Sequence, residues 1–117
     1  MLFTISKDFD FAAGHQLGDL PEGHQCARPH GHNYIVRVVL QSSGLRPPGF
    51  VMDYGDLSSL KAYLDETFDH RWLNDVVEFE PTAENLAAHL LGWCSTMGWP
   101  VKRVGVSETP KTWAWAQ

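Results

Sequence analysis

Residues 31–41, GHNYIVRVVLQ, constrain the fold more than any other part of the 117-residue chain. Side chains along this segment alternate in character, which is the pattern of a β-strand with two different faces. Alternate residues from His32 to Leu40 share one face, and those from Asn33 to Gln41 share the other. We therefore expect a long strand here, paired with at least one other strand.

Two helices are expected after this strand. Apolar residues recur at helical spacing from Leu57 to Phe68, and either Asp53 or Asp56 can cap the N-terminus of this helix. A second helix is expected to begin near Thr82, which is a suitable N-cap residue.

Three further strands complete the expected fold. They are predicted over residues 2–11, with a bend near residues 6–8, over residues 101–108 and over residues 111–116. No repeat or linker interrupts the chain, so residues 1–117 are expected to form one antiparallel α+β domain. The unpaired edges of such a sheet favour an oligomer.

The composition argues against several classes of function. The net charge is −5 and no run of lysine or arginine occurs, which argues against binding to nucleic acid or to an anionic membrane. No apolar segment reaches the length of a membrane-spanning helix, and no signal-peptide pattern is present. Cys26 and Cys94 lie far apart, which fits a reducing compartment better than a disulfide. A cytoplasmic protein is therefore expected.

Three histidines form a candidate metal site. His30 and His32 lie on one face of the expected strand, about 6.5 Å apart, and can lean toward one ion. Alone, they are better explained as two half-exposed histidines at a strand start. His15 ends the first strand region, and a hairpin would bring it beside them. Three histidine ligands leave the fourth position of tetrahedral zinc open, as in catalytic sites. His24 lies in the middle of a loop and is not expected to take part.

Cys26 has three possible roles. It could be a fourth metal ligand, an activated nucleophile or base, or an inert buried residue. Its neighbours in QCARP form a polar loop without an apolar pattern, which argues against burial. Cys94 follows Trp93 on the apolar face of a helix and is expected to be inert.

Two further sites contain acidic residues. Asp69 and His70 could form a carboxylate–imidazole pair for proton transfer, but adjacent helical residues do not face each other, so irregular backbone would be needed. Alternatively, His70 is simply a histidine near a helix C-terminus, where the negative end of the helix dipole favours it.

Glu108 shares a strand face with Val104 and Val106, so its carboxylate must be solvated, paired with a cation or used to bind a ligand. Two carboxylate oxygens suit two parallel N–H donors, such as an arginine or an amino-pyrimidinone ring.

The segments FDFAAGH, CARPHGHNY, GFVMDYGDL, LDETFDHRWLN, PTAENLA and VSETP resemble the 6-pyruvoyl-tetrahydropterin synthase / 6-carboxytetrahydropterin synthase family, in the order of that family. The resemblance covers almost the whole chain. It implies the tunnelling fold, a four-stranded antiparallel sheet with two helices inserted between strands 2 and 3. It also implies assembly into trimeric barrels, commonly paired into homohexamers, with active sites at subunit interfaces.

The resemblance also implies roles for individual residues. Cys26 would be the general base, and Asp69 and His70 would be a proton relay supplied by a neighbouring subunit. The residues implied for binding are His15, His30 and His32 for Zn²⁺, and Glu108 and Thr82 for the pterin.

The spacing between Cys26 and His30 bears on the reaction. Three residues separate them, which is similar to the bacterial carboxy-type enzymes of the queuosine (7-deazapurine) pathway. The resemblance therefore implies a zinc-dependent carbon–carbon lyase. It would convert 7,8-dihydroneopterin triphosphate to 6-carboxy-5,6,7,8-tetrahydropterin, with release of acetaldehyde and triphosphate. The alternatives are a pyruvoyl-type synthase, which only eliminates triphosphate, and a non-catalytic pterin- or metal-binding oligomer. Cations that could contact the triphosphate are Arg28, Arg71 and Lys111, although any single one of them is better explained as a solvated surface charge.

Overall fold

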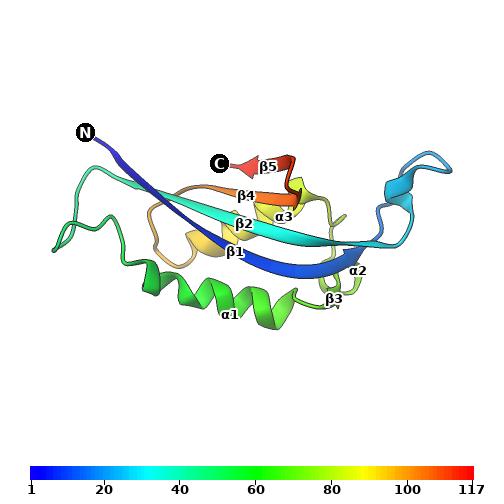
Figure 1. The fold of residues 1–117 in the computed structure, drawn as a ribbon, viewed down its shortest axis with the longest axis horizontal. Coiled ribbons are helices and arrows are strands. Elements are labelled where there is room, and N and C mark those ends of the chain that lie inside the picture. The colour runs from blue at the N-terminus through cyan, green and yellow to red at the C-terminus, as the bar shows by residue number, and fades with distance from the viewer.

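Two long strands form the centre of the computed structural model, which describes residues 1–117 (Figure 1). β1 (Phe3–His15) and β2 (His30–Ser42) pair antiparallel over their whole length. The pairing passes through residues 6–8, where a bend was expected, without a shift in register. β1 also extends to His15, beyond the expected end at residue 11. This extension positions the candidate site, because it carries His15 to a place directly opposite His30.

The other strands lie on both sides of this hairpin. β4 (Val101–Thr109) pairs with β2, and β5 (Thr112–Ala116) pairs with β4, both antiparallel as predicted. A fifth strand was not predicted: β3 (Arg71–Trp72) pairs parallel with β1 and gives the order β3-β1-β2-β4-β5. The four antiparallel strands are confirmed, but the sheet is mixed and has five strands. A two-residue strand is too short to show any alternation in the sequence.

The predicted cap of the second long helix by Thr82 is confirmed, whereas Asp53 caps the 3-10 turn that precedes the first long helix rather than the helix itself. The Asp53 carboxylate accepts the Gly55 N–H at 2.8 Å, and the Thr82 hydroxyl accepts the Asn85 N–H at 3.1 Å. The chain after Asp53 first forms a 3-10 turn and then the first helix. The helical elements are η1 (Gln25–Ala27), η2 (Tyr54–Leu57), α1 (Ser58–Thr67), α2 (Leu73–Val76) and α3 (Ala83–Ser95). None of these helices has the length and apolar character needed to cross a membrane.

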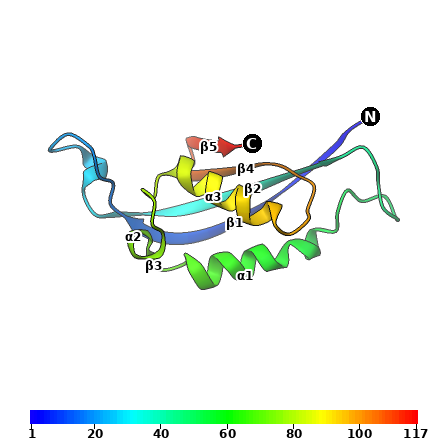
Figure 2. The same ribbon diagram turned by 180° about the vertical axis from the view of Figure 1, so that it is seen from behind.

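Both long helices cover the same face of the sheet (Figure 2). α1 packs against β1, and α3 packs against β4 and β5. The core between the helices and the sheet contains Phe11 and Tyr34, whose ring centroids lie 4.8 Å apart, together with Val36 and Val38 of β2 and leucines of the helices. The alternation of β2 is thus explained: its Tyr34–Leu40 face is buried under the helices, and its other face is free of helix.

Tryptophan and arginine side chains pack together on the helix-free face, near the edge of the sheet that β5 forms. Trp113 and Trp115 stack with their ring centroids 5.5 Å apart, and the Arg37 and Arg103 guanidinium groups lie over these two rings at 4.5 and 4.7 Å. Trp115 lies across Gly105, its partner in β4. A Cβ atom at Gly105 would come within 2.7 Å of the Trp115 ring, so only glycine leaves room for this packing.

Gly105→Ala is therefore expected to lower the free energy of unfolding by about 1–3 kcal/mol, because the added methyl must displace the Trp115 ring. Gly92→Ala is the matched control. Gly92 is exposed on α3, and a Cβ atom added there would have no neighbour within 4 Å, so alanine should stabilise the helix by about 0.5–1 kcal/mol. Urea unfolding of both variants measures the two effects. Equal stability of the two variants would contradict the packing described.

Candidate metal centre and active site

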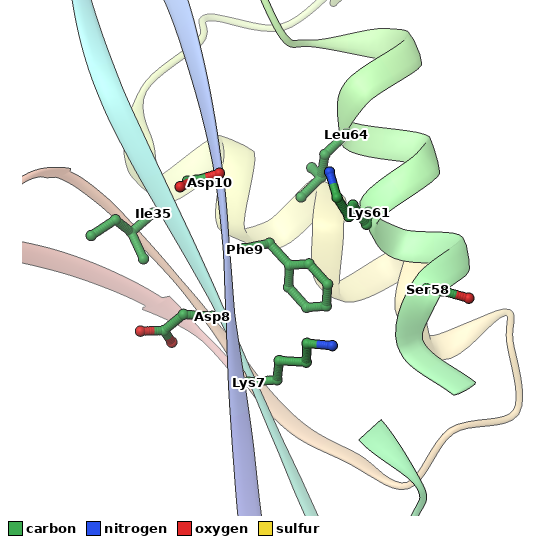
Figure 3. A pocket seen from close by; sticks show the side chains of 8 residues that line it. All are labelled: Lys7, Asp8, Phe9, Asp10, Ile35, Ser58, Lys61 and Leu64. Atoms are coloured by element: carbon green, nitrogen blue, oxygen red, sulfur yellow. The ribbon is translucent and has the colours of Figure 1, made fainter. Parts of the chain in front are cut away.

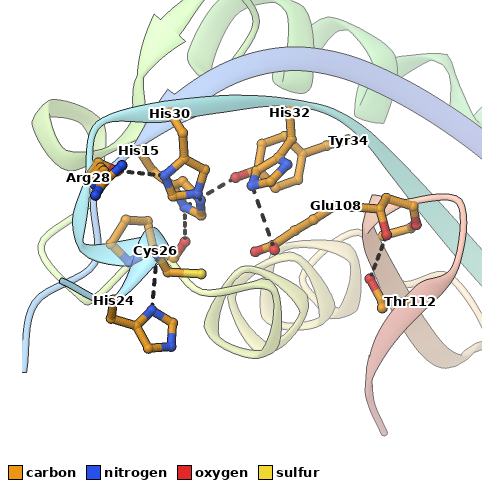
Figure 4. A network of polar contacts seen from close by, with 12 residues as sticks. His15, His24, Cys26, Arg28, His30, His32, Tyr34, Glu108 and Thr112 are labelled. Atoms are coloured by element: carbon orange, nitrogen blue, oxygen red, sulfur yellow. Dashed lines mark hydrogen bonds and ion pairs between the residues drawn. The ribbon is translucent and has the colours of Figure 1, made fainter. Parts of the chain in front are cut away.

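Three histidines meet where β1 ends and β2 begins (Figure 4). His15 is the register partner of His30, and His32 follows two residues later on the same strand. One ring nitrogen from each of His15, His30 and His32 lies within 4.8 Å of the others. The predicted clustering of these three residues is confirmed.

Backbone carbonyls orient two of the imidazoles. His15 Nδ1 lies 2.7 Å from the carbonyl oxygen of Pro81, and His30 Nδ1 lies 2.6 Å from that of Arg28. A carbonyl only accepts, so each Nδ1 carries the proton and each Nε2 presents a lone pair. These two Nε2 atoms lie 2.8 Å apart. Two facing lone pairs repel unless a cation or a proton lies between them, and this orientation is the one found in metal-binding histidines.

His32 completes the donor set. Its Nε2 is the only buried side-chain nitrogen or oxygen without a hydrogen-bond partner. Burial lowers the pKa of His32; the nearby Glu108 carboxylate opposes this, and His15 and His30 lower the pKa further. A neutral imidazole with a free, shielded nitrogen is suited to coordination. The three residues therefore fit a divalent metal ion.

Two residues that support His15 were not identified from the sequence. The Pro81 carbonyl holds the His15 ring from the far end of the chain, 66 residues away, and nothing in the sequence indicates this contact. The Tyr34 hydroxyl lies 3.2 Å from the same Nδ1. Tyr34 follows His32 on the same strand face, so its alternation with the histidines was the available signal. Burial raises the pKa of Tyr34, which keeps the phenol protonated.

Glu108 reaches the histidines from the neighbouring strand (Figure 4). Its Oε2 lies 3.7 Å from His32 Nε2, and its side chain is 25% exposed. The carboxylate thus borders the metal-binding nitrogens and remains open to a ligand. Thr82 is less available, because its hydroxyl caps α3.

Cys26 lies beside the histidine cluster but outside it (Figure 4). It belongs to η1, is partly buried, and forms no disulfide. Its sulfur is not among the grouped metal-binding atoms, so the structure does not favour the fourth-ligand role. Cys94 is fully buried, and burial raises its thiol pKa to about 12, as an inert core residue requires.

Asp69 and His70 form the pair that required irregular backbone. His70 Nδ1 lies 2.8 Å from Asp69 Oδ2, and His70 has a positive φ of 59°. Two hydrogen bonds hold the pair against β1: Asp69 Oδ1 accepts the Ala12 N–H at 2.9 Å, and the His70 N–H donates to the Ala12 carbonyl. The Ala12 N–H and then His70 lower the pKa of Asp69, so its carboxylate is ionised. The His70 side chain is 82% exposed and makes no hydrogen bond to Cys26 within the chain.

Two cavities differ in their relation to these residues. One of about 530 Å³ lies along the β1–β3 edge and is lined by Gly31, His32, His70 and Arg71, among others. The other, of about 320 Å³, lies between β1 and α1 and is lined by Phe9, Lys61 and Leu64 (Figure 3). The second contains none of the predicted site residues.

The candidate triphosphate contacts are all exposed, and none of them makes an ion pair within the chain. They are Arg28, Arg71 and Lys111.

Almost the whole chain matches a known protein family. The match covers residues 4–117, and the family is described as 6-pyruvoyl tetrahydropterin synthase. The chain belongs to this family. The expected resemblance is confirmed, and with it the expectation of an enzyme of the pterin synthase family.

Individual relatives agree with the family match. A Synechocystis protein named 6-carboxy-5,6,7,8-tetrahydropterin synthase is 39% identical, over 92% of this chain and 88% of its own. A Rickettsia bellii protein of the same name is 30% identical, over 76% and 78% of the two chains. The structure of Caenorhabditis elegans 6-pyruvoyl tetrahydropterin synthase superimposes with a TM-score of 0.85 at 26% identity, covering 100% of this chain and 96% of its own. The expected tunnelling fold is thereby confirmed.

Substitution of any cluster histidine by alanine is expected to weaken Zn²⁺ binding by about 100-fold or more, since loss of an outer hydrogen-bond partner alone typically costs 10–100-fold. Competition with a chromophoric chelator measures this affinity. His24→Ala is the control, because His24 lies outside the grouped nitrogens and should leave the affinity within about twofold. An unchanged affinity in His15→Ala would show that the cluster is not a metal site.

Proposed function

We propose that this protein is a zinc-dependent carbon–carbon lyase of the queuosine (7-deazapurine) pathway. It would convert 7,8-dihydroneopterin triphosphate and water to 6-carboxy-5,6,7,8-tetrahydropterin, acetaldehyde and triphosphate. The observation that carries this proposal is the open three-histidine cluster bordered by the Glu108 carboxylate. The names of the relatives and the three-residue spacing from Cys26 to His30 support the carboxy-type reaction.

The atoms of this reaction balance without an external oxidant. The bond between C1′ and C2′ of the substrate side chain breaks, and C1′ becomes the carboxyl carbon with an oxygen from water. C2′ and C3′ leave as acetaldehyde after C3′ loses triphosphate. The side chain as a whole loses two electrons, and the dihydropterin ring gains two as it becomes a tetrahydropterin. The protein must therefore mainly move protons and stabilise negative charge.

Zinc suits the donor set of His15, His30 and His32, because three imidazoles with one open position form a common catalytic zinc site. When bound, it would polarise the side-chain oxygens of the substrate and stabilise developing enolate charge. The chain contributes by fixing the orientation of two imidazoles, because the carbonyls of Pro81 and Arg28 lie at Nδ1 of His15 and His30. Burial lowers the pKa of His32, which favours its neutral form.

Glu108 would hold the pterin ring. Its carboxylate can accept two parallel N–H bonds from the amino-pyrimidinone edge, which fixes both the position and the plane of the ring. The 3.7 Å separation from His32 would place the bound ring next to the metal site. Thr82, the N-cap of α3 next to Pro81, would assist at the same end of the site.

Cys26 would act as the general base that removes a proton from the substrate side chain. The Asp69–His70 pair would deliver and accept further protons, with the Asp69 carboxylate fixing the orientation of the imidazole. Because His70 is exposed at the sheet edge and makes no hydrogen bond to Cys26 of its own chain, we propose that it serves the site of a neighbouring subunit. Trimeric barrels, paired into a homohexamer, would provide such interface sites.

Incubation of the zinc-loaded protein with 7,8-dihydroneopterin triphosphate is expected to release acetaldehyde and 6-carboxytetrahydropterin in equal amounts. Coupled alcohol dehydrogenase measures the acetaldehyde, and chromatography measures the pterin. Turnover of the pterin without acetaldehyde would establish the alternative function, that of a 6-pyruvoyl-tetrahydropterin synthase. The likeness to the Caenorhabditis elegans structure of that name is the observation that favours this alternative. No turnover of either kind would favour a pterin-binding oligomer.

Cys26→Ala is expected to lower kcat by about 100-fold or more, because a positioned acid–base group contributes roughly 10²–10⁴-fold. The variant should bind zinc like the original protein, since the sulfur lies outside the histidine cluster. Cys94→Ala is the matched control, because it keeps the buried position apolar and should retain kcat. Cys94→Ser would instead bury a hydroxyl group in the core. Full activity in Cys26→Ala would remove this residue from the mechanism.

A further inference from the structure

We propose that His24 is the positioning residue for Cys26, and that its Nδ1 acceptor holds the turn in which the thiol lies. This inference rests on the proposed role of Cys26 as the general base. Its structural part, that His24 fixes the conformation around Cys26, can be measured without turnover.

One hydrogen bond carries the inference. The Cys26 N–H donates to His24 Nδ1 at 3.0 Å (Figure 4). His24 is the N-cap of η1, with extended backbone angles of φ −64° and ψ 132°. An N-cap side chain satisfies an N–H that the turn itself leaves free, so it stabilises the start of the turn. Here the N–H belongs to Cys26.

Neighbouring contacts fix the carbonyls of the same segment. The Cys26 carbonyl accepts the Leu17 N–H at 3.1 Å, and the Ala27 carbonyl accepts the Gln16 side-chain amide at 2.8 Å. The Arg28 carbonyl accepts His30 Nδ1, which ties the segment to the metal centre. The amide of Cys26 has no partner other than His24. Loss of the His24 acceptor therefore frees the one backbone group at Cys26 that the hairpin stem does not hold.

The residue type is informative. Aspartate, asparagine, serine and threonine are the usual N-caps, and histidine is not. An aspartate here would place a negative charge in the turn that carries a thiol required as a thiolate, and like charges disfavour ionisation. A neutral imidazole accepts the same hydrogen bond without that charge. Asparagine would do so as well, which provides a conservative replacement.

The experiment compares His24→Ala, which removes the acceptor, with His24→Asn, which keeps one. His24→Ala is expected to lower kcat about tenfold with KM within about twofold, because small misplacement of a reacting group costs rate rather than binding. His24→Asn should restore kcat to within about twofold. Gln25→Ala is the matched control, since the Gln25 side chain is exposed and makes no hydrogen bond. Zinc affinity should be unchanged in all three variants.

Alkylation by iodoacetamide in the absence of substrate tests the same contact directly. Cys94 is buried, so the signal reports Cys26. His24→Ala should accelerate alkylation several-fold, because the released turn exposes the partly buried thiol, and His24→Asn should not. If His24→Ala leaves both kcat and alkylation unchanged, or if His24→Asn behaves like His24→Ala, the proposal is wrong. If alkylation changes as expected while Cys26→Ala is fully active, His24 holds the turn but the assignment of Cys26 as the base fails.

Discussion

The register of the β1–β2 hairpin is the constraint on which the site depends. His15 and His30 are opposite each other, and His32 shares their strand face, only because the ladder runs unbroken from Phe3 to His15. A slip of one residue would turn every side chain of one strand to the other face. It would send His15 to the helix-free face and expose the apolar residues of β1. Packing of the core and assembly of the metal centre therefore select the same register.

The histidine cluster is costly for the protein without a cation. Two Nε2 lone pairs face each other at 2.8 Å, and the buried Nε2 of His32 has no partner. Both features are unfavourable in the free protein and become favourable when a metal ion binds. Preorganisation explains how such a small domain can hold this arrangement. The Pro81 and Arg28 carbonyls fix the rings, and the stacked Phe11–Tyr34 pair supports the Tyr34 hydroxyl beside His15.

Strands, helices and caps could be predicted from the sequence because they follow repeating or local patterns. Features that depend on a single contact between distant segments could not. Alternation located β2, helical spacing located α1, and Thr82 marked the start of α3, because these signals extend over many residues or lie in local capping. β3 was missed because two residues show no period. The Pro81 carbonyl was missed because a backbone contact across 66 residues leaves no mark on side-chain identity. His24 lies outside the metal-binding group, as expected, but its hydrogen bond to the Cys26 N–H was missed because a histidine cap has no common sequence signature.

The Asp69–His70 pair shows how the sheet edge can serve chemistry. The pair lies at the outer edge of β1, where the Ala12 N–H and carbonyl would otherwise be free to pair with another strand. These two hydrogen bonds occupy the edge at this point. His70 has a left-handed backbone conformation, and its Nδ1 lies 2.8 Å from Asp69 Oδ2. The result is an oriented imidazole that faces outward. Within the chain, Asp69 is the only ion-pair partner of this exposed ring, and its left-handed backbone costs strain at a non-glycine residue. A neighbouring subunit that approaches the same edge could exchange protons with this imidazole. The proposed mechanism therefore assigns the pair to a site shared between chains.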